Sequence, residues 1–471
     1  MRRSLLFNAT VYVIGQFATK ILGFVLLVVY ARCLQPADFG VTGTLGAYGM
    51  VLAAVFVLGL NGAVSRHYFD LRRDPDALRS YMASVYAFQL AVSLLIVLAL
   101  ELAGPALWRA ATSGAIVFSD VRLMLWATLF TALIAIPQAF WQAEERPTVL
   151  VASQLAQTVL GLVAGVVFVA ALEQGATGVM RGQLVAAIAL ALVVVGVFVR
   201  EIASRDLRWS HVRGALVYGL PLLPHILGTI LMQTVDRIML ERYAPQTEVG
   251  LYSIAMLLAT VLAMAAGGIN QAWAPHFFRT SSEESPEVAR AKAETFASLF
   301  VALFTGLGLF GALLAPELLH ILGEPYLPVA PYLVPWVIGT LFGIYYLLPA
   351  NQLLLGGQTR WFVIATGSAT VLSIALNAYF LPRGGGGMAA AWIFVAGTAC
   401  QTGVILVAAL MRHRSLLGAR HAVGIAISIA ALVLASRGPS LPVRIALLVG
   451  ASAALYVLLV RGKLREVWPQ R

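Results

Sequence analysis

The chain has 471 residues, of which 60% are hydrophobic and only 11% are charged, and its mean hydropathy is +0.87. A soluble domain carries about 25% charged residues, so this composition excludes an ordinary globular surface and indicates an integral membrane protein. The formal charge of +11 does not point to nucleic acid, because the cytoplasmic loops of membrane proteins collect Lys and Arg. Cys33 and Cys400 lie far apart in apolar sequence and offer no disulfide or metal-ligand spacing, so we expect no cofactor.

Apolar runs predict fourteen membrane spans, most of them close to or above the ~20 residues that one crossing needs. Runs this long and continuous form helices rather than the alternating strands of a barrel, so the predicted fold class is an all-α polytopic membrane protein. The predicted spans are 5–31, 40–62, 80–102, 121–141, 148–172, 178–199, 214–240, 249–275, 295–321, 328–355, 360–382, 386–411, 421–436 and 441–460.

Basic residues are distributed unevenly over the alternate loops of this topology. With the N-terminus inside, 22 Lys and Arg residues lie on the cytoplasmic side, nine lie outside, and Lys20 lies within the first span. The positive-inside rule therefore predicts that both termini are cytoplasmic. No predicted loop exceeds about twenty residues, which is too short for a soluble catalytic domain.

Two segments about 210 residues apart resemble each other. Residues 32–40 (RCLQPADFG) correspond to residues 242–250 (RYAPQTEVG), and Asn61 and Asn270 recur at the far ends of the helices that follow. The matching segments occur in the same order in both halves, so we interpret them as a six-helix duplication with a pseudo-twofold axis along the membrane normal. The predicted domains are one six-helix lobe at 1–205, a second at 206–415, and two additional helices with a tail at 416–471.

Polar residues are unexpected in a helix that faces lipid, because each unmatched polar group there costs several kcal/mol. The first span nevertheless places Asn8, Tyr12, Gln16 and Lys20 at steps of four. The seventh span does the same with His225, Thr229 and Gln233, and continues to Asp236 and Arg237. Residues four apart share one helix face. Both helices are therefore predicted to present a hydrophilic stripe to a central cavity, although Asp236 and Arg237 could equally form a structural ion pair.

The candidate cavity residues carry net positive charge. Arg32 and Arg242 lie at the outer ends of the two polar helices, and Arg66 lies at the inner end of the second span. Cations in a low-dielectric cavity require an anionic partner, and a phosphate-bearing substrate would supply one. Asn61 and Asn270 are better explained by hydrogen bonds between packed helices. The chain has no Walker A loop, HExxH or GxSxG motif, so a secondary transporter is expected rather than an enzyme.

The seventh span and its exit carry a recognisable pattern. Asp236-Arg237, the segment from Gly250 to Ser253 (GLYS) and the loop from Leu34 to Gly40 (LQPADFG) resemble the polysaccharide transport family of the multidrug/oligosaccharidyl-lipid/polysaccharide exporter superfamily. Within that family the chain is most similar to Wzx-type O-antigen flippases. The resemblance covers nearly the whole chain.

The resemblance implies translocation of an undecaprenyl-diphosphate-linked oligosaccharide from the cytoplasmic to the periplasmic leaflet of a bacterial inner membrane. The implied partners are this substrate, membrane lipids, a glycan polymerase and a chain-length regulator. Asp236 and Arg237 match the family's pair, whereas Lys20 matches it only in residue type and region. Lipid II flippases, multidrug/cation antiporters and membrane glycan polymerases or ligases are the alternatives; the antiporter is disfavoured by the basic character of the two polar spans.

Overall fold

The computed structural model describes residues 15, 18–19, 22–23, 25–204, 206–412, 416–435 and 440–461, and the secondary structure of this part of the chain is helical, without a strand. The α-helices are α2 (Pro36–Val57), α3 (Leu60–Leu71), α4 (Pro75–Ala111), α5 (Phe118–Ala143), α6 (Pro147–Gly165), α7 (Gly175–Glu201), α8 (Trp209–Gly219), α9 (Leu223–Tyr243), α10 (Gln246–Glu283), α11 (Pro286–Leu313), α12 (Ala315–Leu319), α13 (Ala330–Leu355), α14 (Arg360–Phe380), α15 (Gly386–Arg412), α16 (Ala419–Ala435) and α17 (Leu441–Leu455). Short 3-10 segments are η2 (Leu220–Leu222), η3 (Glu324–Val329) and η4 (Leu381–Arg383), and π-helical turns are η1 (Val166–Ala171) and η5 (Tyr456–Val460).

The number of spans agrees with the sequence. Among the described residues, twelve helical segments are long and apolar enough to cross a membrane, and α16 is a shorter apolar helix. Most of the first predicted span, 5–31, lies outside the described residues. The prediction of an all-α protein with about fourteen membrane helices is confirmed.

Several helices begin where the sequence marks their first turn. Proline stands at the first helical position of α2, α4, α6 and α11, where its missing N–H costs no hydrogen bond and its fixed φ suits a helix. The carboxylate of Asp74 adds a cap to α4 by accepting hydrogen bonds from the main-chain N of Asp76 and Ala77.

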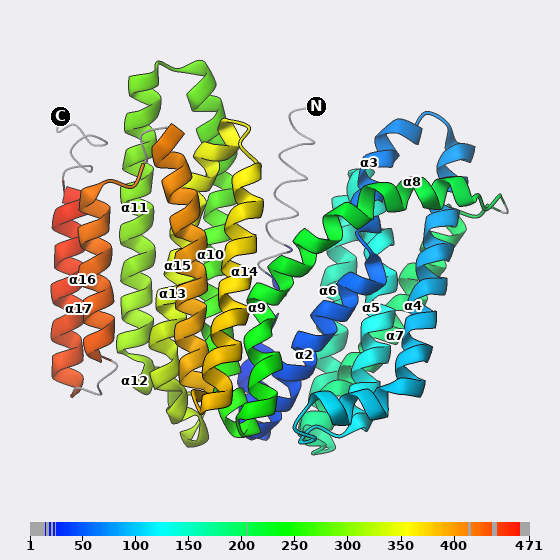
Figure 1. Ribbon diagram of the computed structural model, residues 1–471, viewed down its shortest axis with the longest axis horizontal. Coiled ribbons are helices and arrows are strands. Elements are labelled where there is room, and N and C mark those ends of the chain that lie inside the picture. The colour runs from blue at the N-terminus through cyan, green and yellow to red at the C-terminus, as the bar shows by residue number, and fades with distance from the viewer. Residues whose placement is uncertain are drawn as a thin grey trace. The chain divides into compact units, whose positions relative to one another are not determined.

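The chain forms two compact units, residues 1–250 and 251–471. In the first unit α5 is central and packs against α2, α3, α4, α6 and α7. Its core includes the buried side chains of Trp141, Phe198 and Tyr86. In the second unit α13 packs against α11 and α15, α14 packs against α15, and α16 and α17 lie together along α11 (Figure 1). The predicted lobe boundaries near residues 205 and 415 follow the internal repeat and stay a prediction.

Two helices of the first unit are broken where they meet. Leu58 and Gly59 both have positive φ, at 52° and 70°, and separate α2 from α3. The 3-10 turn η2, which contains Pro221, separates α8 from α9, so that α8 runs across the first unit while α9 runs along α2 (Figure 1). A Cβ on Gly59 would approach the carbonyl oxygen of Gly219 to 2.6 Å, so the contact between the breaks requires glycine.

Candidate functional site

Helix α9 carries most of the described candidate residues. The side chains of His225, Thr229 and Gln233 are exposed and lie at steps of four, whereas Asp236 and Arg237 are buried. Their spacing places the three exposed residues on one face. The hydroxyl of Thr229 donates to the carbonyl of His225 within the helix at 3.0 Å. These three residues therefore form one exposed polar face of α9, and the prediction that this face lines a cavity stays a prediction.

Arg237 is a buried cation held by main-chain carbonyls. Its side chain is 6% exposed. One terminal nitrogen donates to the carbonyl of Gly43 in α2 at 3.4 Å, and the other donates to the carbonyl of Gln233 at 3.1 Å. Its Nε is buried without a hydrogen-bond partner, and no carboxylate of the described residues forms an ion pair with the guanidinium. A buried charge in such surroundings is stabilised by an anion that supplies the missing acceptor.

Asp236 and Glu241 are the buried carboxylates of the same helix. Asp236 is 4% exposed and accepts a hydrogen bond from the main-chain N of Arg237 at 2.8 Å, and among the described contacts no ion pair joins the two side chains. Glu241 is 1% exposed and accepts hydrogen bonds from the Oγ of Ser113 at 2.6 Å and from its main-chain N at 3.2 Å. Glu241 therefore anchors α9 to the loop between α4 and α5, a role that its sequence context did not indicate.

Among the described contacts, none joins Arg66, Arg32 or Arg242 to Arg237. Arg66 lies on α3 and forms an exposed ion pair with Asp70 at 2.8 Å, on the last turns of the α2–α3 span. Arg32 and Arg242 are exposed, at the ends of the first helix and of α9. Lys20 and Gln16 lie outside the described residues. The described site is thus α9 itself, and the contribution of the first span stays a prediction.

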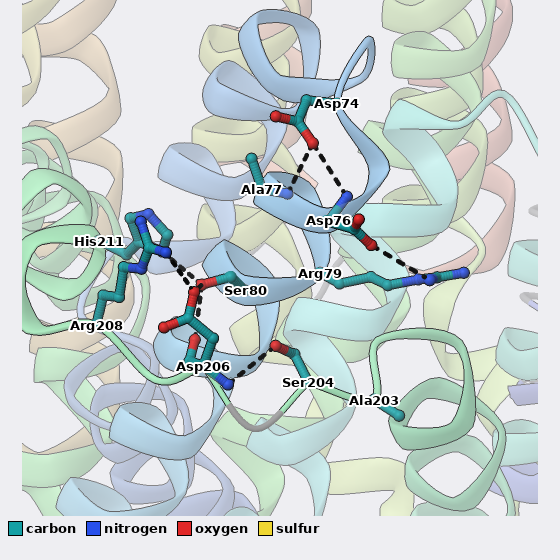
Figure 2. A pocket seen from close by; sticks show the side chains of 10 residues that line it. All are labelled: Asp74, Asp76, Ala77, Arg79, Ser80, Ala203, Ser204, Asp206, Arg208 and His211. Carbon is teal, nitrogen blue, oxygen red and sulfur yellow. Dashed lines mark hydrogen bonds and ion pairs between the residues drawn. The ribbon is translucent and has the colours of Figure 1, made fainter.

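A polar cavity of about 510 Å³ lies between the start of α4 and the segment that joins α7 to α8 (Figure 2). The hydroxyl of Ser80 donates to the carbonyl of Asp206 at 2.6 Å and lies 3.5 Å from Nδ1 of His211. Asp206 pairs with Arg208 at 2.6 Å, and Asp76 pairs with Arg79 at 3.7 Å. Each ion pair lies within one segment, and the hydrogen bonds from Ser80 to the carbonyl of Asp206 and from the main-chain N of Arg208 to Ser84 hold the connecting segment against α4.

Two carboxylates outside the membrane-spanning segments have shifted pKa values. The hydrogen bond from the Arg208 guanidinium, followed by its positive charge, holds the pKa of the Asp206 carboxyl below its ordinary value. Near the end of α5, burial raises the pKa of Glu144. Within the described residues, no group of three His, Cys, Asp or Glu side chains could hold a metal ion.

With this geometry established, comparison with known proteins decides the family. A family model described as polysaccharide biosynthesis protein matches residues 5–281, more than half of the chain. The chain belongs to the polysaccharide biosynthesis protein family. This match confirms the resemblance to polysaccharide transport flippases, and membership in the family identifies the chain as a membrane transport protein rather than an enzyme.

Relatives of the chain include two proteins from Haemophilus influenzae. A protein of the Lsg locus is 23% identical over 379 residues, which cover 78% of this chain and 89% of the relative. An uncharacterised membrane protein is 23% identical over 368 residues, covering 76% of this chain and 85% of the relative.

Solved structures share the fold. The inward closed conformation of the lipid II flippase MurJ has a TM-score of 0.74 at 12% identity and covers 96% of this chain and 99% of MurJ. An inward-facing multidrug resistance transporter of the MATE family has a TM-score of 0.67 at 17% identity and covers 88% of this chain and 96% of the transporter. At these identities the similarity shows that the chain shares the fold of these two proteins.

Proposed function

We propose that this protein is a flippase that moves an undecaprenyl-diphosphate-linked oligosaccharide from the cytoplasmic to the periplasmic leaflet of a bacterial inner membrane by alternating access. The family match and the flippase fold support the transport of a lipid-linked substrate. The basic bias of the loops supports the direction of insertion, with both termini in the cytoplasm.

The observation that carries the proposal is the buried guanidinium of Arg237, whose Nε lacks an acceptor within the described structure. A diphosphate offers several anionic oxygens and can satisfy such a donor in a charge-assisted hydrogen bond. The exposed face formed by His225, Thr229 and Gln233 on the same helix offers groups that can bond to sugar hydroxyls.

The other basic candidates extend this site in the proposal. Lys20 and Gln16 would line the cavity from the first span, and Arg32 and Arg242 would lie at its outer end. Arg66 would meet the headgroup at the inner mouth, and Asp236 would orient the turn of α9 that carries Arg237.

A hydrated cavity explains how the headgroup crosses. In hydrocarbon each unmatched sugar hydroxyl would cost several kcal/mol, and a polar path between helices removes most of this barrier. Outward movement of negative charge is favoured by an inside-negative potential, by about 2.3 kcal/mol per charge per 100 mV. Transport in this direction does not require ATP. A polymerase and a chain-length regulator would act on the product at the outer face.

A lipid II flippase is the second candidate, favoured by the TM-score of 0.74 with MurJ. Both functions use a polyprenyl diphosphate carrier and the same fold. Deletion of the gene separates them, because loss of lipid II export stops growth whereas loss of an oligosaccharide flippase alters only the surface glycan.

The proposal is tested by surface-glycan export in a deletion strain that carries variants of the protein. Arg237→Ala and Lys20→Ala should insert normally and reduce export, because each removes a cation from the diphosphate site. Arg290→Ala is the matched control, since Arg290 forms an ordinary ion pair with Glu294 on α11. Export at the parental rate by both site variants, with equal protein in the membrane, would overturn the assignment.

A further inference from the structure

The two segments of the internal repeat contact each other in the first unit. A Cβ on Gly40 would overlap the carbonyl oxygen of Gln246, and a Cβ on Gly250 would overlap the carbonyl oxygen of Pro36. Gly40 and Gly250 are equivalent in the repeat, and so are Pro36 and Gln246, since both pairs are 210 residues apart. The contact is therefore reciprocal. Gly40 of the first segment packs against the Gln246 carbonyl of the second, and Gly250 of the second packs against the equivalent carbonyl, that of Pro36, in the first.

Both glycines pack against backbone, which cannot move aside as a side chain can. Pro36 begins α2, and the carboxylate of Asp38 binds this turn to the start of α7 by accepting from the main-chain N of Ala176 at 3.1 Å. Gln246 begins α10. The starts of two membrane helices are thus in direct backbone contact at the end of the unit that the basic bias assigns to the outside.

Arg237 makes a second contact with α2, close to the first one. α9 packs along α2, and the guanidinium of Arg237 reaches the carbonyl of Gly43, one turn beyond Gly40. This is a hydrogen bond from a cation to a neutral carbonyl, at 3.4 Å and with Nε still lacking an acceptor. An anion that binds the guanidinium would compete with the Gly43 carbonyl for the N–H groups of Arg237.

We infer that the reciprocal contact of Gly40 with Gln246 and of Gly250 with Pro36 is the outer gate of the transport path, and that Arg237 is its latch. The gate is closed in this structure. Binding of the diphosphate to Arg237 withdraws the guanidinium from Gly43 and favours separation of α2 from α9 and from residues 246–250, since a ligand shifts a conformational equilibrium by its difference in affinity for the two states. The latch rests on the proposed function, whereas the gate is independent of the substrate.

The gate can be measured without any substrate. Thr44 lies four residues after Gly40 on α2 and is completely buried, so it shares the face of Gly40. In a Cys33→Ser, Cys400→Ser background, and in intact cells of a strain that does not make the lipid-linked oligosaccharide, Thr44→Cys should react slowly with a membrane-impermeant maleimide added outside. Gly250→Ala should raise this labelling about tenfold, the population change that ~1.4 kcal/mol of overlap produces, and Gly40→Ala should do the same.

Matched controls come from the same helices. Gly267 in α10 and Gly46 in α2 have open space where a Cβ would lie, so Gly267→Ala and Gly46→Ala should leave labelling at the parental level. Arg237→Gln should raise labelling in the absence of substrate, because it removes the latch, and Arg290→Gln should not. A residue that only binds substrate would leave substrate-free labelling unchanged.

Parental labelling of folded Gly250→Ala and Gly40→Ala proteins, or equal labelling in the Gly267→Ala control, would overturn the gate. Loss of both variants from the membrane, with no rise in labelling of the folded remainder, would mark the contact as permanent packing and would also overturn it. Glycan export is not part of the readout, so the gate stands or falls separately from the proposed function. If Arg237→Gln is labelled at the parental level while Gly250→Ala is labelled faster, the latch is refuted and the gate is not.

Discussion

Asp38 offers the sharpest test of how the first unit is held together. One carboxylate oxygen accepts from the main-chain N of Gln35 at 2.8 Å, and the other accepts from the main-chain N of Ala176 at 3.1 Å. The first bond caps α2 and the second joins it to the start of α7, 138 residues away. Asp38→Ala removes both bonds and leaves two helix-terminal N–H groups without this acceptor.

Hydrogen bonds to a charged group contribute about 1.5–3 kcal/mol each, but Asp38 is only partly buried. We therefore expect Asp38→Ala to lower the free energy of unfolding by roughly 2 kcal/mol. For a unit of this size that corresponds to a fall in the thermal midpoint of roughly 4–8 °C. The midpoint is measured on purified protein in detergent. Asp38→Asn keeps acceptor capacity and should fall between the parent and Asp38→Ala.

Asp76 provides the matched control, because it is also an aspartate in the first turn of a membrane helix, α4. Its side chain is 95% exposed and its ion pair with Arg79 is long, at 3.7 Å. Exposed pairs of this kind contribute little, so Asp76→Ala should leave the midpoint nearly unchanged. Equal shifts for Asp38→Ala and Asp76→Ala would refute the reasoning, since the bond to Ala176 would then contribute nothing.

Two further predictions concern polar contacts elsewhere. The Nδ2 of Asn351 donates to the Oδ1 of Asn270 at 2.8 Å between α13 and α10, so a double-mutant cycle with alanine at both positions should give a coupling of about 1 kcal/mol; purely additive midpoints would contradict this bond. Arg208 lowers the folded-state pKa of Asp206. The stabilisation of the folded protein by this ion pair is therefore fully present above the unfolded-state pKa of about 4, and it is lost as the pH falls through the lower folded-state pKa. The protection factors of amides 206–208, which are exchange rates corrected for the intrinsic rate at each pH, should therefore fall in acid, and Asp206→Asn should abolish that fall; an unchanged fall in Asp206→Asn would exclude this carboxyl as the cause.

Much of the fold was predictable from composition and periodicity. A lipid environment requires every backbone group to bond within its own segment, so long apolar runs determine helices, and twelve of the predicted spans are found as long apolar helical segments. The polar face of α9 followed from steps of four in one helix, and His225, Thr229 and Gln233 are indeed exposed together. The hydrogen bond of Asn270 with Asn351 also agrees with the packing role expected for Asn270.

The hydrogen-bond partners of the buried charged residues could not be predicted from the sequence. The partners of Arg237 in α2 and of Glu241 in the loop after α4 are distant along the chain. Main-chain carbonyls are acceptors at every position, so no residue pattern marks the ones that a buried guanidinium will reach. Ser80 and Asp206 gave no signal for a comparable reason, because their contact depends on how α8 lies across α4.

The sequence by itself determined that this chain is a helical membrane protein, which helices carry polar faces, and that segments 32–40 and 242–250 are equivalent. These properties depend on residues near one another in the chain and on the solvent that surrounds them. Only the tertiary structure decided that the equivalent segments touch, that Asp38 joins α2 to α7, and that Arg237 faces Gly43. Those contacts join distant segments through backbone atoms that every residue shares, so their geometry is defined only once the helices have packed.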